Sequence, residues 1–365
     1  MCIAFFIGRK AVKVKQTKLS NVKIRGIICA VPRNNVDNKA FETVFSPEDI
    51  EKSANMTGVR TRRIAEGSIC TSDLCTAAAH KLMEDLSWEP ETIDGIIFVS
   101  QTPDHRLPAT SCIIQERLGL SNECAAFDVN LGCSGYVYGL WMASNLIAAS
   151  ALRRVLLLVG DTITKVITPD DKSTAMLFGD AGSATALEYD ESATKISFVL
   201  GTDGKGKDNL IINAGGFRNP TTTENLARNV DPEKGTYSDN YLYMNGGEIF
   251  NFTIKRVPAL VKDLLSISDF ETKDVDYFVF HQANEFILKH LSRKIKLDQE
   301  KCPMNIGKFG NTSSASIPLV IVSELADVLS SNTKKLAMLG FGVGYSWGGV
   351  LIDVGPLLSL GLLEV

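Results

Sequence analysis

Short apolar runs of strand length recur along the chain, with amphipathic stretches of helical spacing between them. Seven runs stand out because they are rich in aliphatic and β-branched residues: Val22–Ile28, Gly95–Val99, Ala125–Asn130, Arg154–Gly160, Ala181–Leu187, Tyr277–Phe280 and Lys335–Phe341. Continuous apolar strands separated by helices predict sheets that are buried on both faces. The pattern is therefore typical of an α/β fold.

The order of these features repeats in two halves of the chain. In each half a strand is followed by a helix-opening turn, at Cys133 and at Gly310–Thr312, and then by a further pair of strands that ends the half. The last of these strands is Trp347–Ile352. We predict an internal duplication of one α/β unit with a boundary near 188–198, which gives halves at 18–190 and 191–365.

A polar segment, Asp203–Asp239, lies between the halves. It is rich in Gly, Asn, Thr and Pro and has few apolar residues. Such a composition predicts a long excursion over the surface that contributes little to the core.

Composition and charge exclude several classes of function. The 365 residues are 45% hydrophobic and 22% charged, and the net charge of −4 argues against nucleic acid as a partner. The apolar run within Met1–Lys10 is too short to span a bilayer, and no other stretch reaches 18 uninterrupted apolar residues. We therefore expect a soluble, cytoplasmic protein that does not bind membranes.

The eight cysteines are irregularly spaced, without a CxxC pair or a Cys/His cluster of metal-ligand spacing. The sequence therefore predicts no metal site. Seven of the eight are expected to be reduced and mostly buried thiols of a cytosolic protein: Cys2, Cys29, Cys70, Cys75, Cys112, Cys124 and Cys302.

Cys133 differs from the others because it lies between a predicted strand and a predicted helix. The unpaired N–H groups and the positive end of the helix dipole favour a thiolate there, which would make the sulfur a nucleophile. Gly132 and Gly135 would let substrate and backbone approach closely. The alternative is a buried structural cysteine, which is the usual fate of this residue type.

Two polar residues stand at comparable places in the second half. His281 ends a strand, and Asn311 lies in the turn before a helix. Strand ends and helix starts are where α/β folds collect catalytic groups, so these side chains would converge with Cys133 if the halves pack about a pseudo-twofold axis. Taken singly, His281 could be an ordinary hydrogen-bonding residue and Asn311 a helix cap.

Gly340–Gly344 fits a GxGxG pattern loosely, which could indicate a phosphate-binding loop. No strand-loop-helix unit of the right kind follows it. We therefore reject a dinucleotide site.

Several segments in the same order resemble the β-ketoacyl-acyl-carrier-protein synthase III family, and the similarity runs from about Val22 to Val354. They are Asp128–Tyr136, Met176–Ala184, His281–Asn284, Gly310–Pro318 and Gly340–Gly348. The resemblance implies the thiolase fold, with two similar halves in a five-layered αβαβα arrangement. It also implies a homodimer without a permanently bound cofactor.

The resemblance further implies a decarboxylative Claisen condensation. Cys133 would accept an acyl group from a thioester of coenzyme A or of acyl-carrier protein, and the backbone N–H groups of Cys133 and Val343 would form the oxyanion hole. His281 and Asn311 would hydrogen-bond the carbonyl of a malonyl thioester and stabilise its enolate. Ser100–Thr102 lacks the Glu that hydroxymethylglutaryl-CoA synthases carry there, which weighs against that non-decarboxylating relative.

Other residues are assigned to substrate contacts by the same resemblance. Leu107 would reach across the dimer and close the partner's acyl pocket, although it could also be an ordinary interface residue. The remaining residues expected to contact substrate are Thr57, Ala283, Asn284 and Phe286.

The sequence departs from the family where coenzyme A would bind. Lys52 and Met56 stand where Trp and Arg usually hold the adenine, and Phe286 replaces an Arg. These changes remove aromatic and cationic contacts to the cofactor's head, and Arg60, Arg62 or Lys289 could replace the lost charge. They suggest a specialised member of the family that could transfer its acyl group to a different acceptor. The last alternative is a non-catalytic dimer partner, which the intact set of Cys133, His281 and Asn311 argues against.

Overall fold

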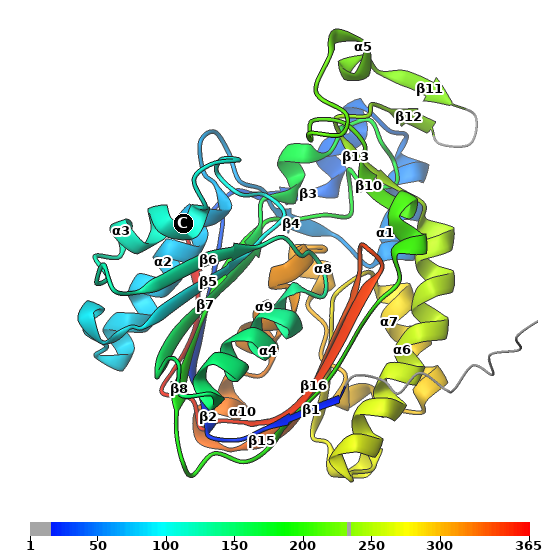
Figure 1. The fold of residues 1–365 in the computed structure, drawn as a ribbon. Helices are drawn as coiled ribbons and strands as arrows, with labels where there is room; N and C mark the ends of the chain where they lie inside the picture. Colours follow the sequence, from blue (N-terminus) through cyan, green and yellow to red (C-terminus); the bar gives the residue numbers. More distant parts are fainter. Residues whose placement is uncertain (1–15, 232–234) are drawn as a thin grey trace, which may run out of the picture.

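Two main sheets face each other across a central layer of helices in the computed structural model, which describes residues 16–231 and 235–365 (Figure 1). The first sheet contains β2 (Val22–Val31), β5 (Gly95–Val99), β6 (Ala125–Val129), β7 (Arg154–Asp161), β8 (Ala181–Tyr189) and β17 (Ser359–Glu364), in the order β17-β2-β8-β7-β5-β6. The second contains β1 (Gln16–Leu19), β9 (Ile196–Thr202), β14 (Tyr277–Phe280), β15 (Lys334–Gly342) and β16 (Ser346–Val354), in the order β1-β9-β16-β15-β14. Every apolar run that the pattern predicted as a strand is a strand, with its ends shifted by up to three residues.

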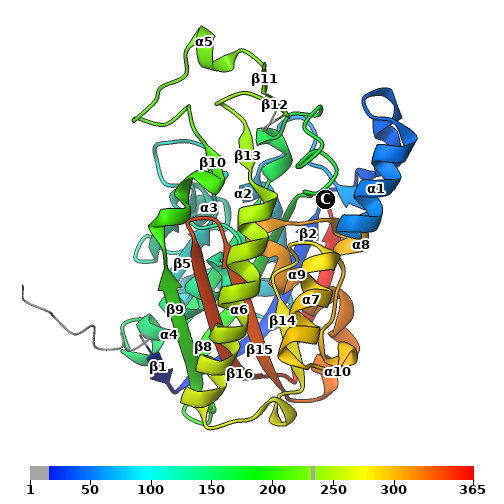
Figure 2. The ribbon, with the colours of Figure 1, turned by 90° about the vertical axis from the view of Figure 1, so that its right-hand side faces the viewer.

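Helices cover both sheets and fill the space between them (Figures 1 and 2). The outer face of the first sheet carries α2 (Thr71–Leu86) and α3 (Thr110–Arg117), and that of the second carries α6 (Gly246–Ser268) and α7 (Glu285–Ile295). Between the sheets lie α4 (Gly135–Ala148) and α9 (Ser316–Glu324), with α10 (Ala326–Ser331) following α9. The αβαβα order of layers predicted for the chain is confirmed.

The central layer is apolar because it has no solvent side. Helix α4 contacts β5 and β7 in one sheet and β15 and β16 in the other. A helix that is covered on both sides needs apolar residues around most of its circumference, as the sequence GYVYGLWMASNLIA of α4 provides. All five residues of β5 are buried as well, which explains its uninterrupted apolar run.

Each main sheet takes one terminal strand from the other half of the chain. β17, at the C-terminal end, pairs in parallel with β2 of the first sheet. β1, near the N-terminal end, pairs antiparallel with β9 of the second sheet. The predicted boundary at 188–198 falls in the connection between β8 and β9, but neither sheet is built from one continuous segment.

The polar segment after β9 contains regular structure. It begins with the 3₁₀-helix η4 (Gly204–Asn209), and β10 (Leu210–Ile212) pairs antiparallel with β13 (Leu242–Met244) in a two-stranded ribbon. Its distal part, with α5 (Thr223–Leu226), β11 (Asn229–Asp231) and β12 (Gly235–Tyr237), projects from the body as predicted (Figure 1). The ribbon itself lines a cavity and is therefore not a surface excursion.

The remaining elements are spread along the chain. They are β3 (Asn35–Asp37), β4 (Thr61–Arg63), α1 (Pro47–Thr57), α8 (Ile306–Phe309) and the 3₁₀-helices η1 (Asn38–Thr43), η2 (Pro90–Thr92), η3 (Ile163–Val166), η5 (Thr272–Asp274), η6 (Gln299–Lys301) and η7 (Ser313–Ala315). Helix α1 has Ser46 as its N-cap and ends at Gly58, whose φ of 79° suits glycine.

All seven described cysteines are free, and of the six expected to be inert Cys29, Cys75 and Cys302 are buried while Cys112 is exposed. Cys2 and the apolar run in Met1–Lys10 lie outside the described residues. Within the described part of the chain, no helix combines the length and the apolar character that a membrane span requires.

Candidate active site

Cys133 lies between the end of β6 and the start of α4, where the sequence pattern placed it. Its side chain is 6% exposed, and it lines two cavities at once. Gly342, at the end of β15, approaches so closely that a Cβ atom there would lie 2.9 Å from the sulfur. This position therefore requires glycine, and it brings the second half of the chain against the thiol.

The predicted thiolate is opposed by the surroundings of Cys133. Burial and the negative charge of Asp161 raise the pKa of the thiol to about 12, although hydrogen bonds from the Val343 backbone, the Ser313 side chain and its own backbone act in the other direction. The expectation of a lowered pKa was wrong. It considered the stabilisation of a thiolate by the helix start but neglected the desolvation of the buried Cys133 sulfur. The same hydrogen bonds place the N–H groups of Cys133 and Val343 at the sulfur.

His281 follows β14 and is 2% exposed. Its Nδ1 lies 2.7 Å from the hydroxyl oxygen of Ser316 at the start of α9, and its ring packs edge-on against Phe341. Burial lowers the pKa of His281 to about 3, so the imidazole is neutral at physiological pH. A buried, neutral histidine can donate or accept a hydrogen bond without bringing a charge into the site.

Asn311 lies in the turn before η7 and α9, and the N-cap of η7 is its neighbour Thr312. Its Oδ1 accepts a hydrogen bond from Ser313 N at 2.9 Å, while its Nδ2 lies 3.4 Å from the carbonyl oxygen of Ala283. Ser313 has a φ of 50°, a left-handed conformation that costs roughly 1–2 kcal/mol for a residue with a side chain. The turn thus fixes the Asn311 amide with its N–H group towards β14.

The three predicted residues line one narrow cavity of about 70 Å³. Cys133 comes from the first half, and His281 and Asn311 come from the second, so the predicted convergence of strand ends is confirmed in space. The remaining lining residues include Leu177, Phe178, Leu210, Met244, Ile249, Thr253, Ala283, Asn284, Ile287, Phe341 and Gly342. We call this the narrow cavity.

A wide cavity of about 260 Å³ opens on the other side of Cys133. Most of its lining is apolar, with polar groups near the thiol, and the residues are Gln101, Asn130, Ile163, Val166, Phe178, Leu210, Ile212, Leu242, Ser313 and Val343. Seven aliphatic or aromatic side chains next to a thiol can hold a hydrocarbon chain. The thiol therefore stands between this wide cavity and the narrow cavity, in which His281 and Asn311 supply polar groups.

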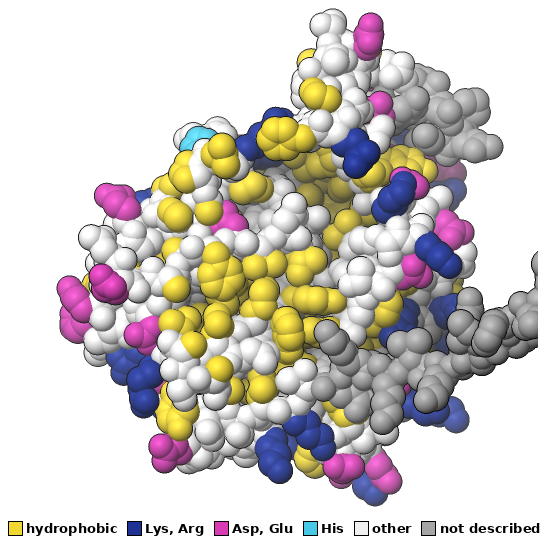
Figure 3. Space-filling model, in the orientation of Figure 1, with side chains coloured by type: hydrophobic (Ala, Val, Ile, Leu, Met, Phe, Trp, Pro, Cys, Tyr) yellow, Lys and Arg dark blue, Asp and Glu magenta, His cyan; other side chains and the backbone are white. Residues whose placement is uncertain are grey.

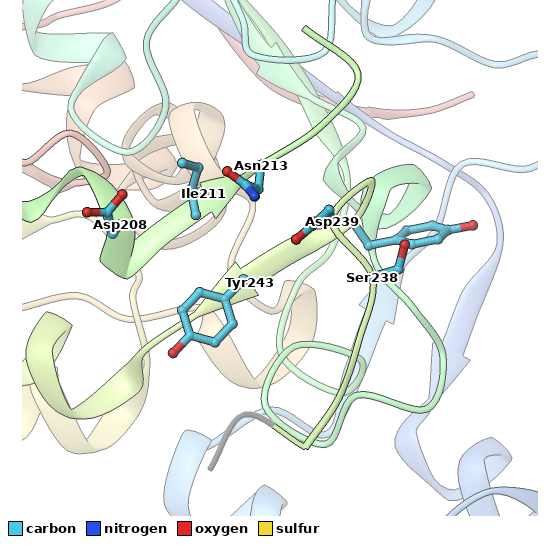
Figure 4. Close-up of a pocket in the computed structure, with 7 residues that line it drawn as sticks. Asp208, Ile211, Asn213, Ser238, Asp239 and Tyr243 are labelled. Carbon is cyan, nitrogen blue, oxygen red and sulfur yellow. The ribbon is translucent and has the colours of Figure 1, made fainter. Parts of the chain in front are cut away.

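The ribbon of β10 and β13 forms a wall of the wide cavity with one of its faces. Leu210, Ile212 and Leu242 point into this cavity, as alternation along a strand requires. The register partners Ile211 and Tyr243 belong to the opposite face, which lines a separate cavity of about 260 Å³ together with Asp208, Asn213, Ser238, Asp239 and Tyr241 (Figure 4). Sequence analysis missed the ribbon because three-residue strands inside a Gly- and Asn-rich segment give no readable period.

Asp161, at the end of β7, is a buried residue that sequence analysis also missed. Its Oδ1 accepts hydrogen bonds from Gln101 N at 2.7 Å and Ser100 Oγ at 3.2 Å, and its Oδ2 accepts one from Ser314 Oγ at 2.7 Å. One carboxylate therefore joins the loop after β5 to the turn that carries Asn311. Because these partners belong to different halves, Asp161 fixes the position of both halves beside Cys133.

The residues expected to contact substrate occupy different surroundings. Ala283 and Asn284 line the narrow cavity, and Asn284 Oδ1 accepts a hydrogen bond from Ile287 N as the N-cap of α7. Phe286 is 55% exposed on the first turn of α7, and Leu107 is 86% exposed. Thr57 lines neither cavity at Cys133, and its hydroxyl donates to Ser53 O within α1.

The residues named as replacements for the lost positive charge are engaged elsewhere. Arg62 is 2% exposed and bonds Asn38 and Phe178, so it cannot reach a ligand at the mouth, and that suggestion was wrong. Arg60 pairs with Glu51 at 3.3 Å, and Lys289 pairs with Glu285 at 2.6 Å. Met56, at 58% exposure, and Lys52 are exposed on α1.

Comparison with known proteins identifies the relatives of this chain. Residues 127–204 match the family model described as 3-oxoacyl-[acyl-carrier-protein] synthase III, and residues 265–354 match the model of its C-terminal part. The β-ketoacyl-[acyl-carrier-protein] synthase III of Clostridioides difficile strain 630 is 34% identical over 329 residues, which are 90% of this chain and 97% of that protein.

Solved structures agree with this result. The 3-oxoacyl-(acyl-carrier protein) synthase of Burkholderia xenovorans LB400 superposes with a TM-score of 0.92 at 46% identity, over 96% of this chain and 99% of that one. The priming β-ketosynthase of the R1128 polyketide pathway superposes with a TM-score of 0.79 at 25% identity, over 92% and 97% of the two chains. The chain therefore belongs to the β-ketoacyl-[acyl-carrier-protein] synthase III family of condensing acyltransferases, which have the thiolase fold.

Proposed function

We propose that the protein condenses an acyl group, held as a thioester on Cys133, with a malonyl thioester that loses CO₂. The observation that carries this proposal is the position of the thiol between the wide apolar cavity and the narrow cavity that His281 and Asn311 line. A chain held in one chamber can then meet a polar acceptor in the other. No cofactor is required for either step.

In the first half-reaction the sulfur of Cys133 attacks the carbonyl carbon of an acyl thioester. The C–S bond to the donor breaks, and the donor thiol leaves with the proton that Cys133 gave up. Negative charge passes through the carbonyl oxygen, which the N–H groups of Cys133 and Val343 would stabilise. Val343 can serve although it is not glycine, because it is absent from the described residues with positive φ.

In the second half-reaction the malonyl thioester would enter the narrow cavity. When CO₂ leaves, the bonding electrons form an enolate whose oxygen His281 and Asn311 would stabilise by donating hydrogen bonds. If Ser316 donates its hydroxyl proton to Nδ1 of His281, the neutral ring carries its own proton on Nε2. The enolate carbon then attacks acyl-Cys133 and releases the thiol.

Gln101 supports decarboxylation as the source of the carbanion. It lines the wide cavity beside Cys133, and a Cβ atom at Gly132 would collide with its amide oxygen. An amide in this place cannot remove a proton from an unactivated thioester as a carboxylate could. Loss of CO₂ generates the carbanion without a base.

The outer face of α6 and α7 fits an acidic carrier protein. These helices pack side by side next to the narrow cavity (Figure 2), and their exposed cations are Lys255, Lys262, Arg293 and Lys294. Positive charge in this place would steer an acidic carrier towards the cavity. We place the reaction in the cytoplasm, because the seven described cysteines are free thiols.

The surface around β6 fits a homodimer. β6 is an edge strand of the first sheet, so one side of its backbone has no neighbouring strand within the described chain. Hydrophobic side chains gather on the face of the molecule that Figure 3 shows. The partly buried hydrophobic residues of β6 and α4 include Phe127, Val129, Trp141 and Met142. A second copy of the chain would cover this face.

Leu107 tests both the dimer and the acyl pocket. If it closes the wide cavity of the partner subunit, Leu107→Ala should extend the range of accepted acyl groups to longer or branched chains, and Leu107→Trp should narrow it. The measurement is kcat/KM for a series of acyl donors. A fully active monomer in sedimentation experiments would refute the cross-dimer role.

The donor's 3′-phosphate should contribute little to acylation. Arg60 and Lys289 are paired with acidic residues, and Phe286 and Met56 offer no charge, so acyl-CoA and its dephospho form should differ less than about threefold in kcat/KM. Phe286→Arg should increase the preference for the phosphate-bearing ester, with Phe286→Leu as its matched control. A large loss on removing the phosphate from the donor of the wild-type protein would contradict this expectation.

The function is tested by mixing the protein with acyl donors and malonyl acceptors and measuring both half-reactions by mass spectrometry. Cys133 should gain the acyl mass, and malonyl thioester should then release CO₂ and a β-ketoacyl thioester. Acylation without decarboxylation would favour the alternative function, in which the acyl group passes to a different acceptor. The similarity to a priming β-ketosynthase of polyketide synthesis is the reason for testing this alternative. Failure of acylation with every donor would favour a non-catalytic dimer partner.

A further inference from the structure

Two side-chain amides in the wide cavity have no partner in the protein. Gln101 follows β5 and Asn130 follows β6, and both line the cavity that contains the Cys133 thiol. Within residues 16–231 and 235–365, neither amide group forms a hydrogen bond with another protein group. Both amide atoms of the half-buried Gln101 keep accessible surface, and Asn130 is exposed. The two amides are therefore open to a ligand that occupies the wide cavity.

The amide of Gln101 lies beside the start of any chain that Cys133 carries. A Cβ atom at Gly132 would collide with Oε1 of Gln101, so this amide packs directly against the residue that precedes Cys133. The same Cβ atom would lie 2.9 Å from Cγ1 of Val343, whose N–H group belongs to the oxyanion hole proposed above. With the thioester carbonyl held there, the amide of Gln101 stands next to the carbon atoms that follow the carbonyl.

The apolar part of the wide cavity comes from other elements. Ile163 and Val166 belong to η3, and Leu210, Ile212 and Leu242 belong to the ribbon of β10 and β13. The lining thus combines amides that follow β5 and β6 with hydrocarbon side chains on η3 and the ribbon. A ligand that matches this lining has a polar group near the thiol and a hydrocarbon tail beyond it.

We propose that the acyl group transferred to Cys133 carries a hydroxyl group close to its thioester, as a 3-hydroxyacyl chain does. A hydroxyl group both donates and accepts hydrogen bonds, and a side-chain amide offers both an acceptor and donors. The hydroxyl donates to Oε1 of Gln101 and accepts from the amide nitrogen of Asn130, while the rest of the chain packs against η3 and the ribbon. This inference rests on the proposed acylation of Cys133 and names the class of its donor.

An unsubstituted acyl chain is the weaker substrate because it leaves both amides without a partner. Such a chain displaces water from Gln101 and Asn130 and does not replace the hydrogen bonds that the water made. A site that hydrogen-bonds a substrate hydroxyl discriminates against the analogue that lacks it. Because Gln101 is only half-buried and Asn130 is exposed, we expect a discrimination of about tenfold.

Acylation of Cys133 by three coenzyme A thioesters of equal chain length tests the proposal. The donors are 3-hydroxyhexanoyl-CoA, hexanoyl-CoA and 6-hydroxyhexanoyl-CoA, and mass spectrometry of the acylated protein gives kcat/KM for each. The 3-hydroxyhexanoyl donor should be about tenfold better than the hexanoyl donor. The 6-hydroxyhexanoyl donor should be the poorest, because its hydroxyl falls among the apolar side chains of η3 and the ribbon.

Gln101→Met tests the assignment of the amide. Methionine keeps the length of the side chain and removes its donor and acceptor, so the two donors 3-hydroxyhexanoyl-CoA and hexanoyl-CoA should then differ by less than about threefold. Leu242→Met is the matched control, because it alters the apolar wall of the same cavity and leaves both amides in place. Its ratio of kcat/KM for the two donors should equal that of the wild-type protein.

The outcomes separate this proposal from the proposed function. Equal or faster acylation of the wild-type protein by hexanoyl-CoA would overturn the proposal and leave the condensing function standing. A tenfold preference for the 3-hydroxyhexanoyl donor that persists in Gln101→Met would overturn it as well. Failure of all three donors to acylate Cys133 would contradict the proposed function itself, and this inference with it.

Discussion

Cys133→Ala is expected to abolish formation of the acyl-enzyme and to leave the fold intact. Alanine suits the position between β6 and α4, and the substitution removes only the sulfur from a site where the side chain is 6% exposed. Acyl donor incubated with the variant should therefore add no mass to the protein. The rate of condensation should fall by nearly the whole factor that the covalent route provides. No second thiol among the described residues lines either cavity and could replace Cys133.

Cys75→Ala is the matched control for this experiment. Cys75 is also a buried thiol in the first half, but it lies on α2 and lines neither cavity. The control should be acylated at the wild-type rate. Acyl mass gained by Cys133→Ala at an unchanged rate would show that another residue is the nucleophile.

The pH dependence of thiol alkylation follows from the same surroundings. Because burial raises the pKa of Cys133 to about 12, the thiolate is a small fraction at neutral pH and grows about tenfold for each unit of pH. The rate at which iodoacetamide alkylates Cys133 in the free protein should therefore increase steadily between pH 7 and 9. A rate that is already constant in this range would show that the helix start and the hydrogen bonds from Val343 and Ser313 outweigh burial.

Sequence reasoning located the catalytic candidates because their signals are local. Cys133, His281 and Asn311 each stand where an apolar strand ends or a helix begins, and the spacing of those elements is readable in the chain. The α/β class followed from strands that are apolar along their whole length, while the five layers were implied by the family resemblance. These features depend on neighbouring residues and not on distant ones.

The missed residues depend on contacts between distant segments. In the sequence Asp161 is a single acidic residue at the end of an apolar strand. Its role in holding two segments together becomes visible only in the fold, where Gln101 and Ser314 donate hydrogen bonds to its carboxylate. Arg62 reads as a surface charge between Thr61 and Arg63 until the fold encloses it. The pKa of Cys133 was misjudged for the same reason, since desolvation is set by the packing of the second half against the thiol.

His281→Ala and Asn311→Ala should separate the two half-reactions. Each should reduce malonyl decarboxylation and condensation by about 10²–10³-fold, the usual loss for one donor to a developing oxyanion. Acylation of Cys133 should survive to a substantial degree, because its carbonyl oxygen would be stabilised by backbone N–H groups of Cys133 and Val343. Single-turnover acylation and CO₂ release from malonyl thioester measure the two steps independently.

Conservative variants test whether these side chains act as donors. Asn311→Asp keeps the size and the acceptor for Ser313 N but replaces the Nδ2 donor with a charged oxygen, so it should impair decarboxylation at least as much as alanine does. Ser316→Ala should impair it less, because it removes only the partner that orients His281. Equal losses of acylation and condensation in the alanine variants would mean that His281 and Asn311 assist the acylation of Cys133 and do not act by stabilising the enolate.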